Sequence, residues 1–282
     1  MIAYISTDRN LETGKSNPSL NLNQKTHILN IYDLKKDRIL TQMKFHNDIE
    51  TFNISYKKLY VVLETEIFVF ELFSFNNTHY FETKPNPYGI FANSINDDII
   101  VFPGNKKYFI KIKNLETQTV FDFNFEENYQ SFFMNKSASI LAVVNQNGNT
   151  IKLIDLESLM VIKTLKRGMG DALICNISFS ETDDYMAASS NKGTVHIWKI
   201  MEEEGNETKP KTGHRIFHKV TGKLFSSGEK SFVKLHLKEN YSFVGFVGKT
   251  NNVFIIAESG KLYMAEGKDD NFKINKTLTL LN

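Results

Sequence analysis

The feature that most constrains this chain is a hairpin of two strands that recurs along its length. Each copy has an apolar strand, a short turn, an alternating strand, and then a polar residue followed by Leu or Ile. Five copies span Lys58–Leu72, Asp98–Leu115, Ile140–Leu156, Tyr185–Ile200 and Val253–Glu266. A sixth, partial copy joins Met1–Thr7 to His27–Leu34 across a polar segment. The aromatic content of 12% favours strands as well.

The spacing of these copies indicates the architecture. The polar residue near the end of the hairpin recurs at intervals of 38, 43, 41 and 44 residues, at Asp33, Glu71, Asn114, Asp155 and Lys199. A period of about 40–45 residues built from short strands is typical of β-propeller blades. Glycine turns supply the positive φ that tight hairpins need, at Asn147-Gly148, Lys192-Gly193 and Ser259-Gly260.

We therefore expect an all-β protein that forms a single β-propeller domain over residues 1–282. The pattern places six blades at about 1–44, 45–88, 89–127, 128–170, 171–232 and 233–282. The fifth blade carries an insertion at about 201–230.

Composition excludes several classes of protein. With 41% hydrophobic and 23% charged residues, the chain has enough apolar material for a full core. A net charge of +2 gives no global field that would attract nucleic acid.

The single cysteine, Cys175, excludes an internal disulfide and a cysteine metal cluster, and its apolar neighbours predict a buried, inert thiol. No apolar run approaches the roughly 18 residues of a membrane span, and residues 1–10 do not resemble a signal peptide.

The insertion combines positive charge with apolar side chains. It opens with three glutamates at 202–204, and residues 208–228 then carry five Lys or Arg and no Asp or Glu. An anionic membrane attracts such a segment by about 1 kcal/mol per basic residue, and its apolar side chains insert shallowly. The expected membrane-inserting residues are Arg215, Ile216, Phe217, Lys219, Val220, Lys223 and Leu224. An ordinary surface loop is the alternative interpretation.

Two motifs connect the chain to a known family. The segment Leu165-Lys166-Arg167-Gly168-Met169 is followed, 23 residues after Arg167, by Ser190-Asn191-Lys192-Gly193-Thr194-Val195-His196-Ile197. Together they resemble the PROPPIN family, the WIPI-type WD-repeat β-propellers that bind phosphoinositides in autophagy. That family's hallmark is Phe/Leu-Arg-Arg-Gly, an apolar strand, and Ser-Ser-x-x-x-Thr-Val-His. The resemblance covers nearly the whole chain. The family has seven blades, and this chain matches it from the second blade onward, so the first blade is missing from the pattern.

The resemblance implies a phosphoinositide pocket. An inositol phosphate needs a guanidinium for charge-assisted bonds, with hydroxyl and backbone donors beside it. Arg167 supplies the guanidinium, and Thr194 and His196 share one face of a strand. The expected pocket residues are Arg167, Gly168, Ser190, Thr194, His196 and Lys166. Alternatively, His196 is a core histidine and the hydroxyls are ordinary hairpin residues.

The family's other pocket is degraded in this sequence. Where the family has Ser, Ser and Thr, this chain has Val143, Asn145 and Asn149 on either side of Gly148. Lys152 stands in place of an arginine, and lysine lacks the planar fork that binds phosphate in a bidentate manner. We therefore expect a weak or lost second pocket at Asn145, Gly148 and Lys152, and lower membrane avidity.

The resemblance implies a peripheral membrane protein rather than an enzyme. The sequence has no catalytic triad elbow or phosphate-binding glycine loop, and His214 and His218 lack a third metal ligand, so no metal or cofactor is expected. The implied ligand is phosphatidylinositol 3-phosphate, or the 3,5-bisphosphate, on autophagosomal, endosomal or vacuolar membranes facing the cytoplasm. The implied partner is an autophagy lipid-transfer protein or other autophagy scaffold, with a role in protein transport and no nucleic acid. The alternative is a WD-repeat-like scaffold that binds only proteins.

Overall fold

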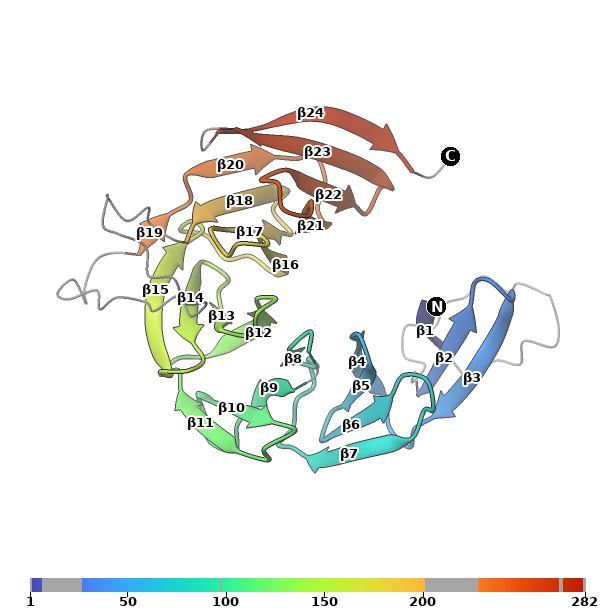
Figure 1. Ribbon diagram of the computed structural model, residues 1–282. Coiled ribbons are helices and arrows are strands. Elements are labelled where there is room, and N and C mark those ends of the chain that lie inside the picture. Colours follow the sequence, from blue (N-terminus) through green and yellow to red (C-terminus); the bar gives the residue numbers. More distant parts are fainter. Residues whose placement is uncertain (1, 7–26, 97, 201–227, 269–270, 281–282) are drawn as a thin grey trace, which may run out of the picture. The chain divides into compact units, whose positions relative to one another are not determined.

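The computed structural model describes residues 2–6, 27–96, 98–200, 228–268 and 271–280 (Figure 1). Within these ranges the chain forms strands, turns and loops and no helix, so no helical segment there could cross a bilayer. The chain divides into two compact units, Met1–Phe125 and Glu126–Asn282, each with its own sheets. The prediction of an all-β protein is confirmed.

The first unit contains three antiparallel sheets. The first sheet has three strands, β1 (Ile2–Ser6), β2 (Ile28–Asp33) and β3 (Arg38–Lys44). The second has four, β4 (Ile49–Ile54), β5 (Lys58–Leu63), β6 (Glu66–Glu71) and β7 (Asn77–Glu82). The third has β8 (Ala92–Asn93), β9 (Ile99–Pro103), β10 (Phe109–Asn114) and β11 (Val120–Asn124). The partial repeat is confirmed, because β1 pairs with β2 across the residues that separate them.

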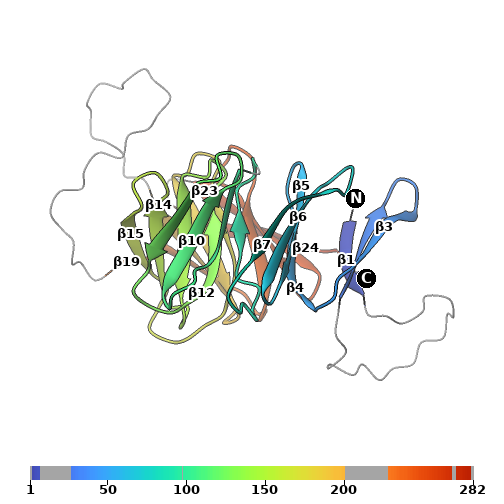
Figure 2. The same cartoon turned by 90° about the horizontal axis from the view of Figure 1, so that it is seen from below.

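The second unit contains the other three sheets of the described chain (Figure 2). One sheet joins β12 (Tyr129–Met134), β13 (Ile140–Asn145), β14 (Thr150–Asp155), β15 (Met160–Lys166) and β19 (Glu229–Lys230). The next joins β16 (Ile174–Phe179), β17 (Tyr185–Ser190), β18 (Thr194–Lys199) and β20 (Val233–His236). The last joins β21 (Ser242–Phe246), β22 (Val253–Ala257), β23 (Lys261–Lys268) and β24 (Asn271–Thr279).

The chain beyond residue 228 corrects one predicted boundary. We expected the sixth blade to begin at 233, but β20 pairs with β18 and so completes the fifth sheet. β19, at the end of the expected insertion, pairs with β15 in parallel and so extends the fourth sheet. Sequence periodicity missed this because both strands are short and neither belongs to a hairpin. Residues 201–227 of the insertion lie outside the described residues.

Alternation along the strands explains the core of the second unit. Met186, Ala188 and Trp198 belong to one buried cluster with side chains of the β12–β15 sheet. Ala187 and Val195, on the opposite face, belong to another cluster with the β21–β24 sheet. The sheet of β16, β17, β18 and β20 is therefore packed on both faces, and each fully buried aliphatic side chain contributes about 1.5–3 kcal/mol. The predicted glycine turns are confirmed, with φ of 63° at Gly148, 64° at Gly193 and 77° at Gly260.

Candidate functional site

The strand register places the predicted hydroxyl and imidazole groups on one face of one sheet. Ser190 pairs with Thr194, and the next position of β18 on that face is His196. Trp198, two residues further on, is buried against the β12–β15 sheet, so this face looks toward that sheet. Arg167 directly follows β15, which brings the guanidinium to the same region.

Arg167 is half-buried and held by backbone carbonyls. Its Nε donates to the Gly148 oxygen at 2.8 Å, and its Nη2 donates to the Gly170 oxygen. Partial burial lowers the pKa of Arg167, and Asp171 acts in the opposite direction. Arginine nevertheless stays charged in proteins. The two bonds use two of five N–H donors and fix the orientation of the side chain.

The three polar side chains on the β17–β18 hairpin are buried. Ser190 is 1% exposed, Thr194 is 5% and His196 is 2%. The Ser190 and Thr194 hydroxyls lie 3.1 Å apart and share a hydrogen bond. His196 stacks on Trp198, with ring centroids 5.7 Å apart, and its Nδ1 lies 2.9 Å from the Ser231 hydroxyl.

The buried environment keeps His196 neutral. Burial lowers the pKa of His196 to about 4, and the positive charges of Lys234, Arg167 and His236 act in the same direction. Arg167 is therefore close enough to His196 for its charge to be felt there. Within the described structure the His196 Nε2 has no hydrogen-bond partner.

Exposure decides which predicted residues a ligand can reach. Lys166 and Gly168 are exposed and Arg167 is half-buried, so a headgroup can touch all three as the structure stands. Contact with Ser190, Thr194 and His196 requires neighbouring side chains to move, because these three are buried.

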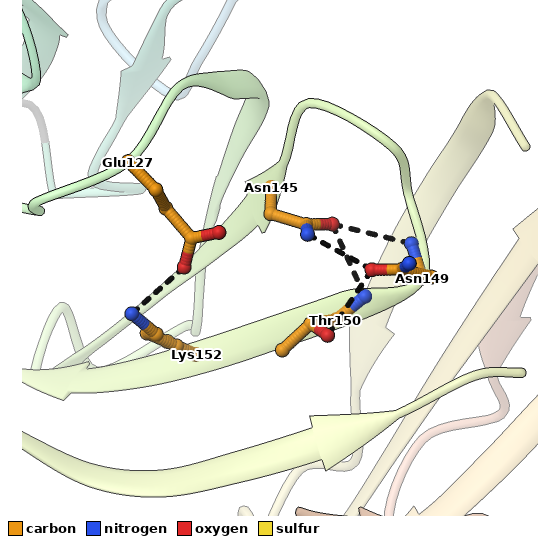
Figure 3. Close-up of polar contacts among 5 residues, drawn as sticks. All are labelled: Glu127, Asn145, Asn149, Thr150 and Lys152. Atoms are coloured by element: carbon orange, nitrogen blue, oxygen red, sulfur yellow. Dashed lines mark hydrogen bonds and ion pairs between the residues drawn. The ribbon is translucent and has the colours of Figure 1, made fainter. Parts of the chain in front are cut away.

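The polar groups at the predicted second pocket are already paired with neighbouring residues (Figure 3). Lys152 Nζ forms an ion pair with Glu127 Oε1 at 2.8 Å. Asn145 Nδ2 donates to Asn149 Oδ1 at 2.9 Å, and Asn145 Oδ1 accepts the backbone N–H groups of Asn149 and Thr150 at 3.2 and 3.1 Å. The Glu127 carboxylate is thus already paired with Lys152, the cation that a bound phosphate would need.

Gln130 is a structural contributor that sequence reasoning missed. Its Nε2 donates to the Ala172 oxygen at 3.0 Å, and its Oε1 accepts the Ile174 N–H at 3.0 Å. These bonds hold the chain that follows Arg167 against the Gly148 turn. A Cβ at Gly148 would overlap the Ala172 carbonyl oxygen, so the turn requires glycine for space as well as for φ. Gln130 lies in no recognisable motif, so only the fold reveals it.

Lys163 of β15 bonds to residues on both sides of segment 201–227, which lies outside the described residues. Its Nζ donates to the carbonyl oxygens of Lys199 and Ile200, each at 3.1 Å, and forms an ion pair with Glu229 at 2.9 Å. Lys199 and Ile200 precede that segment and Glu229 follows it. The predicted membrane-inserting residues, all between 215 and 224, lie in it and are not described.

Sequence comparison finds a family and several relatives. The family model described as PROPPIN matches residues 20–234. Autophagy-related protein 18e of Arabidopsis thaliana is 20% identical over 233 residues, covering 82% of this chain and 62% of the relative. WD repeat domain phosphoinositide-interacting protein 2 of Gallus gallus is 24% identical over 260 residues, covering 84% of this chain and 59% of the relative. The chain thus spans less than two thirds of each of these relatives.

Solved structures share the fold. Kluyveromyces lactis Hsv2 is 16% identical with a TM-score of 0.71, covering 90% of this chain and 81% of that chain. A structure described as a complex of KlAtg21 with the coiled-coil of AgAtg16 is 15% identical with a TM-score of 0.71, covering 92% of this chain and 79% of that chain. The predicted β-propeller class is confirmed.

Proposed function

The chain belongs to the PROPPIN family, and from that premise we propose that its Arg167 pocket binds phosphatidylinositol 3-phosphate or the 3,5-bisphosphate. The family comprises autophagy-related, phosphoinositide-interacting proteins that are not enzymes. The protein would associate peripherally with membranes that carry the lipid, on autophagosomal, endosomal or vacuolar surfaces. There it would recruit autophagy machinery.

One observation carries this proposal. A half-buried, charged guanidinium lies near two buried hydroxyls and a buried, neutral imidazole, which a ligand would reach once neighbouring side chains move. Hydrogen bonds between a cation and phosphate oxygens are about twice as strong as neutral ones, and partial dehydration strengthens them further. Gly168 adds an exposed backbone with no side chain in the way of a ligand.

A partner protein is the finer part of the proposal. The related KlAtg21 was solved with the coiled-coil of AgAtg16, which supports an autophagy scaffold as a partner of this chain too. A lipid-transfer protein is the other partner that the family resemblance implies.

Liposome flotation tests the lipid site. Wild type should float with vesicles that contain phosphatidylinositol 3-phosphate and not with vesicles that contain phosphatidylinositol. Arg167→Ala should bind about 10- to 100-fold more weakly, because it loses charge-assisted bonds worth about 1.5–3 kcal/mol. Arg38→Ala, which removes an exposed arginine of β3, is the matched control and should float like wild type.

Two results would count against the proposal. Equal flotation of wild type and Arg167→Ala would remove the site assignment. A folded wild type that floats with neither lipid would favour a scaffold that binds only proteins.

A further inference from the structure

The loop after β15 carries an apolar side chain that the described protein leaves uncovered. We call residues 167–173 the Arg-Gly loop. Met169 at its centre is 100% exposed, and Leu173 at its end is 50% exposed. Single exposed apolar residues are common on protein surfaces, so exposure alone assigns no role. The surroundings of Met169 provide the argument.

The backbone on both sides holds Met169 clear of the protein. Gly168 and Gly170 flank it, and a Cβ added at either glycine would meet no atom within 4 Å. The centre of the Arg-Gly loop therefore projects into open space.

The two ends of the Arg-Gly loop are fixed. At its start, Arg167 donates a hydrogen bond to the Gly170 carbonyl oxygen. At its end, Leu173 and Asn191 exchange two hydrogen bonds, of 3.0 Å from the Asn191 N–H and 2.9 Å from the Leu173 N–H. Because the ends are held, presenting Met169 to a ligand costs less conformational entropy than ordering a free loop would.

Exposed lysines flank both ends of the Arg-Gly loop. Lys166 is exposed directly before the Arg-Gly loop, and Lys192 is exposed in the turn next to Asn191. Asp171 is the acidic residue of the loop, so Lys166, Arg167 and Lys192 outnumber it. An apolar tip among cations suits an anionic lipid surface.

The shape of the tip separates a membrane from a protein partner. A stable protein interface buries about 800 Å² on each side and needs complementary relief. A projecting methionine between two glycines offers far less area. A bilayer can accept a single side chain between its headgroups.

We propose that Met169, with Leu173 beside it, enters the outer layer of an anionic membrane while Arg167 binds the headgroup. This inference rests on the proposed function and adds a membrane contact outside the insertion at 201–230. The contact would act together with the Arg167 pocket, since two weak attachments on one body reinforce each other.

Met169→Asp tests the contact, and Met160→Asp is its matched control. Met160 is 62% exposed and is the first residue of β15, the strand that precedes the Arg-Gly loop. Each variant therefore replaces an exposed methionine with a carboxylate. On vesicles of phosphatidylcholine, phosphatidylserine and phosphatidylinositol 3-phosphate, Met169→Asp should bind about tenfold more weakly than wild type. Met160→Asp should stay within about twofold. Met169→Ser, which adds no charge beside Arg167, should bind a short-chain, soluble phosphatidylinositol 3-phosphate like wild type.

Two results would overturn the proposal. The first is flotation of Met169→Asp at the wild-type level. The second is loss of soluble-lipid binding in the uncharged variant Met169→Ser, because the residue would then act through the pocket and not through the bilayer.

A fluorescent probe covers the case in which wild type does not bind phosphatidylinositol 3-phosphate vesicles at all. Met169→Cys, made with Cys175→Ser so that one thiol remains, carries an environment-sensitive dye. A blue shift of its emission on phosphatidylserine vesicles, absent for the same dye at Met160→Cys, would support the membrane contact although the proposed function had failed. No shift at residue 169 would overturn the contact as well.

Discussion

Burial sets the charge state of His196. The folded protein lowers the pKa of His196 from 6.5 to about 4, first through burial and then through the charges of Lys234, Arg167 and His236. Between these two values the unfolded chain binds more protons than the folded one. The part of the folding stability that depends on neutral His196 is therefore fully present above about pH 6.5, and it is lost as the pH is lowered toward 4.

Urea unfolding between pH 4.5 and 7.5 measures this effect. Wild type should lose stability with a slope of up to about 1.4 kcal/mol per pH unit more than His196→Gln, which cannot titrate. Identical slopes for wild type and His196→Gln would mean that the imidazole does not resist protonation.

At the scale of the element, the seven-residue strand β15 connects several parts of the second unit. It pairs with β14 on one side and β19 on the other, it leads into Arg167, and it provides Lys163. The Lys163 side chain is 14% exposed and serves three acceptors. Its removal would leave the Glu229 carboxylate and two carbonyls with one donor fewer.

Lys163→Met should therefore lower the free energy of unfolding by about 2–3 kcal/mol, the usual cost of breaking a mostly buried, charge-assisted set of bonds. Chemical denaturation gives the value. Lys136→Met is the comparison, because Lys136 pairs with Glu181 at 2.9 Å on the surface and should cost less than about 1 kcal/mol. Equal costs for the two variants would show that Lys163 contributes no more than a surface ion pair.

Elements also mark where sequence reasoning succeeded and where it could not. The hairpins β13–β14, β17–β18 and β22–β23 follow from local alternation and glycine turns, so the sequence was enough to predict them. β19 and β20 depend on partners more than 30 residues away, and two- and four-residue strands have no periodicity to detect. In the same way, Arg167 was found from a motif, whereas the partners Gln130, Lys163 and Ser231 depend on side-chain contacts between distant segments.

At the scale of the whole molecule, the contrast between the two predicted pockets leads us to expect one lipid site per chain. Lys152 is already paired with Glu127, and the amide side chains beside it are bonded to each other and to the backbone. Among the described residues, Arg167 donates its hydrogen bonds only to carbonyl oxygens, which are weaker competitors for a guanidinium than a phosphate is.

Calorimetric titration with soluble phosphatidylinositol 3-phosphate should therefore give one site per chain. Arg167→Ala should weaken binding about 10- to 100-fold, and Lys152→Ala should leave affinity and stoichiometry unchanged. Two sites per chain, or weaker binding by Lys152→Ala, would contradict the assignment of a single competent pocket.

Because Lys163 bonds to residues on both sides of 201–227, extra residues inserted between Ile200 and Gly228 should lower the free energy of unfolding only slightly. When the ends of a segment are already held together, lengthening it adds only the free-energy cost of loop closure. That cost grows with the logarithm of length, by about 0.6 kcal/mol per doubling. A reporter domain spliced there should therefore leave the sheets intact.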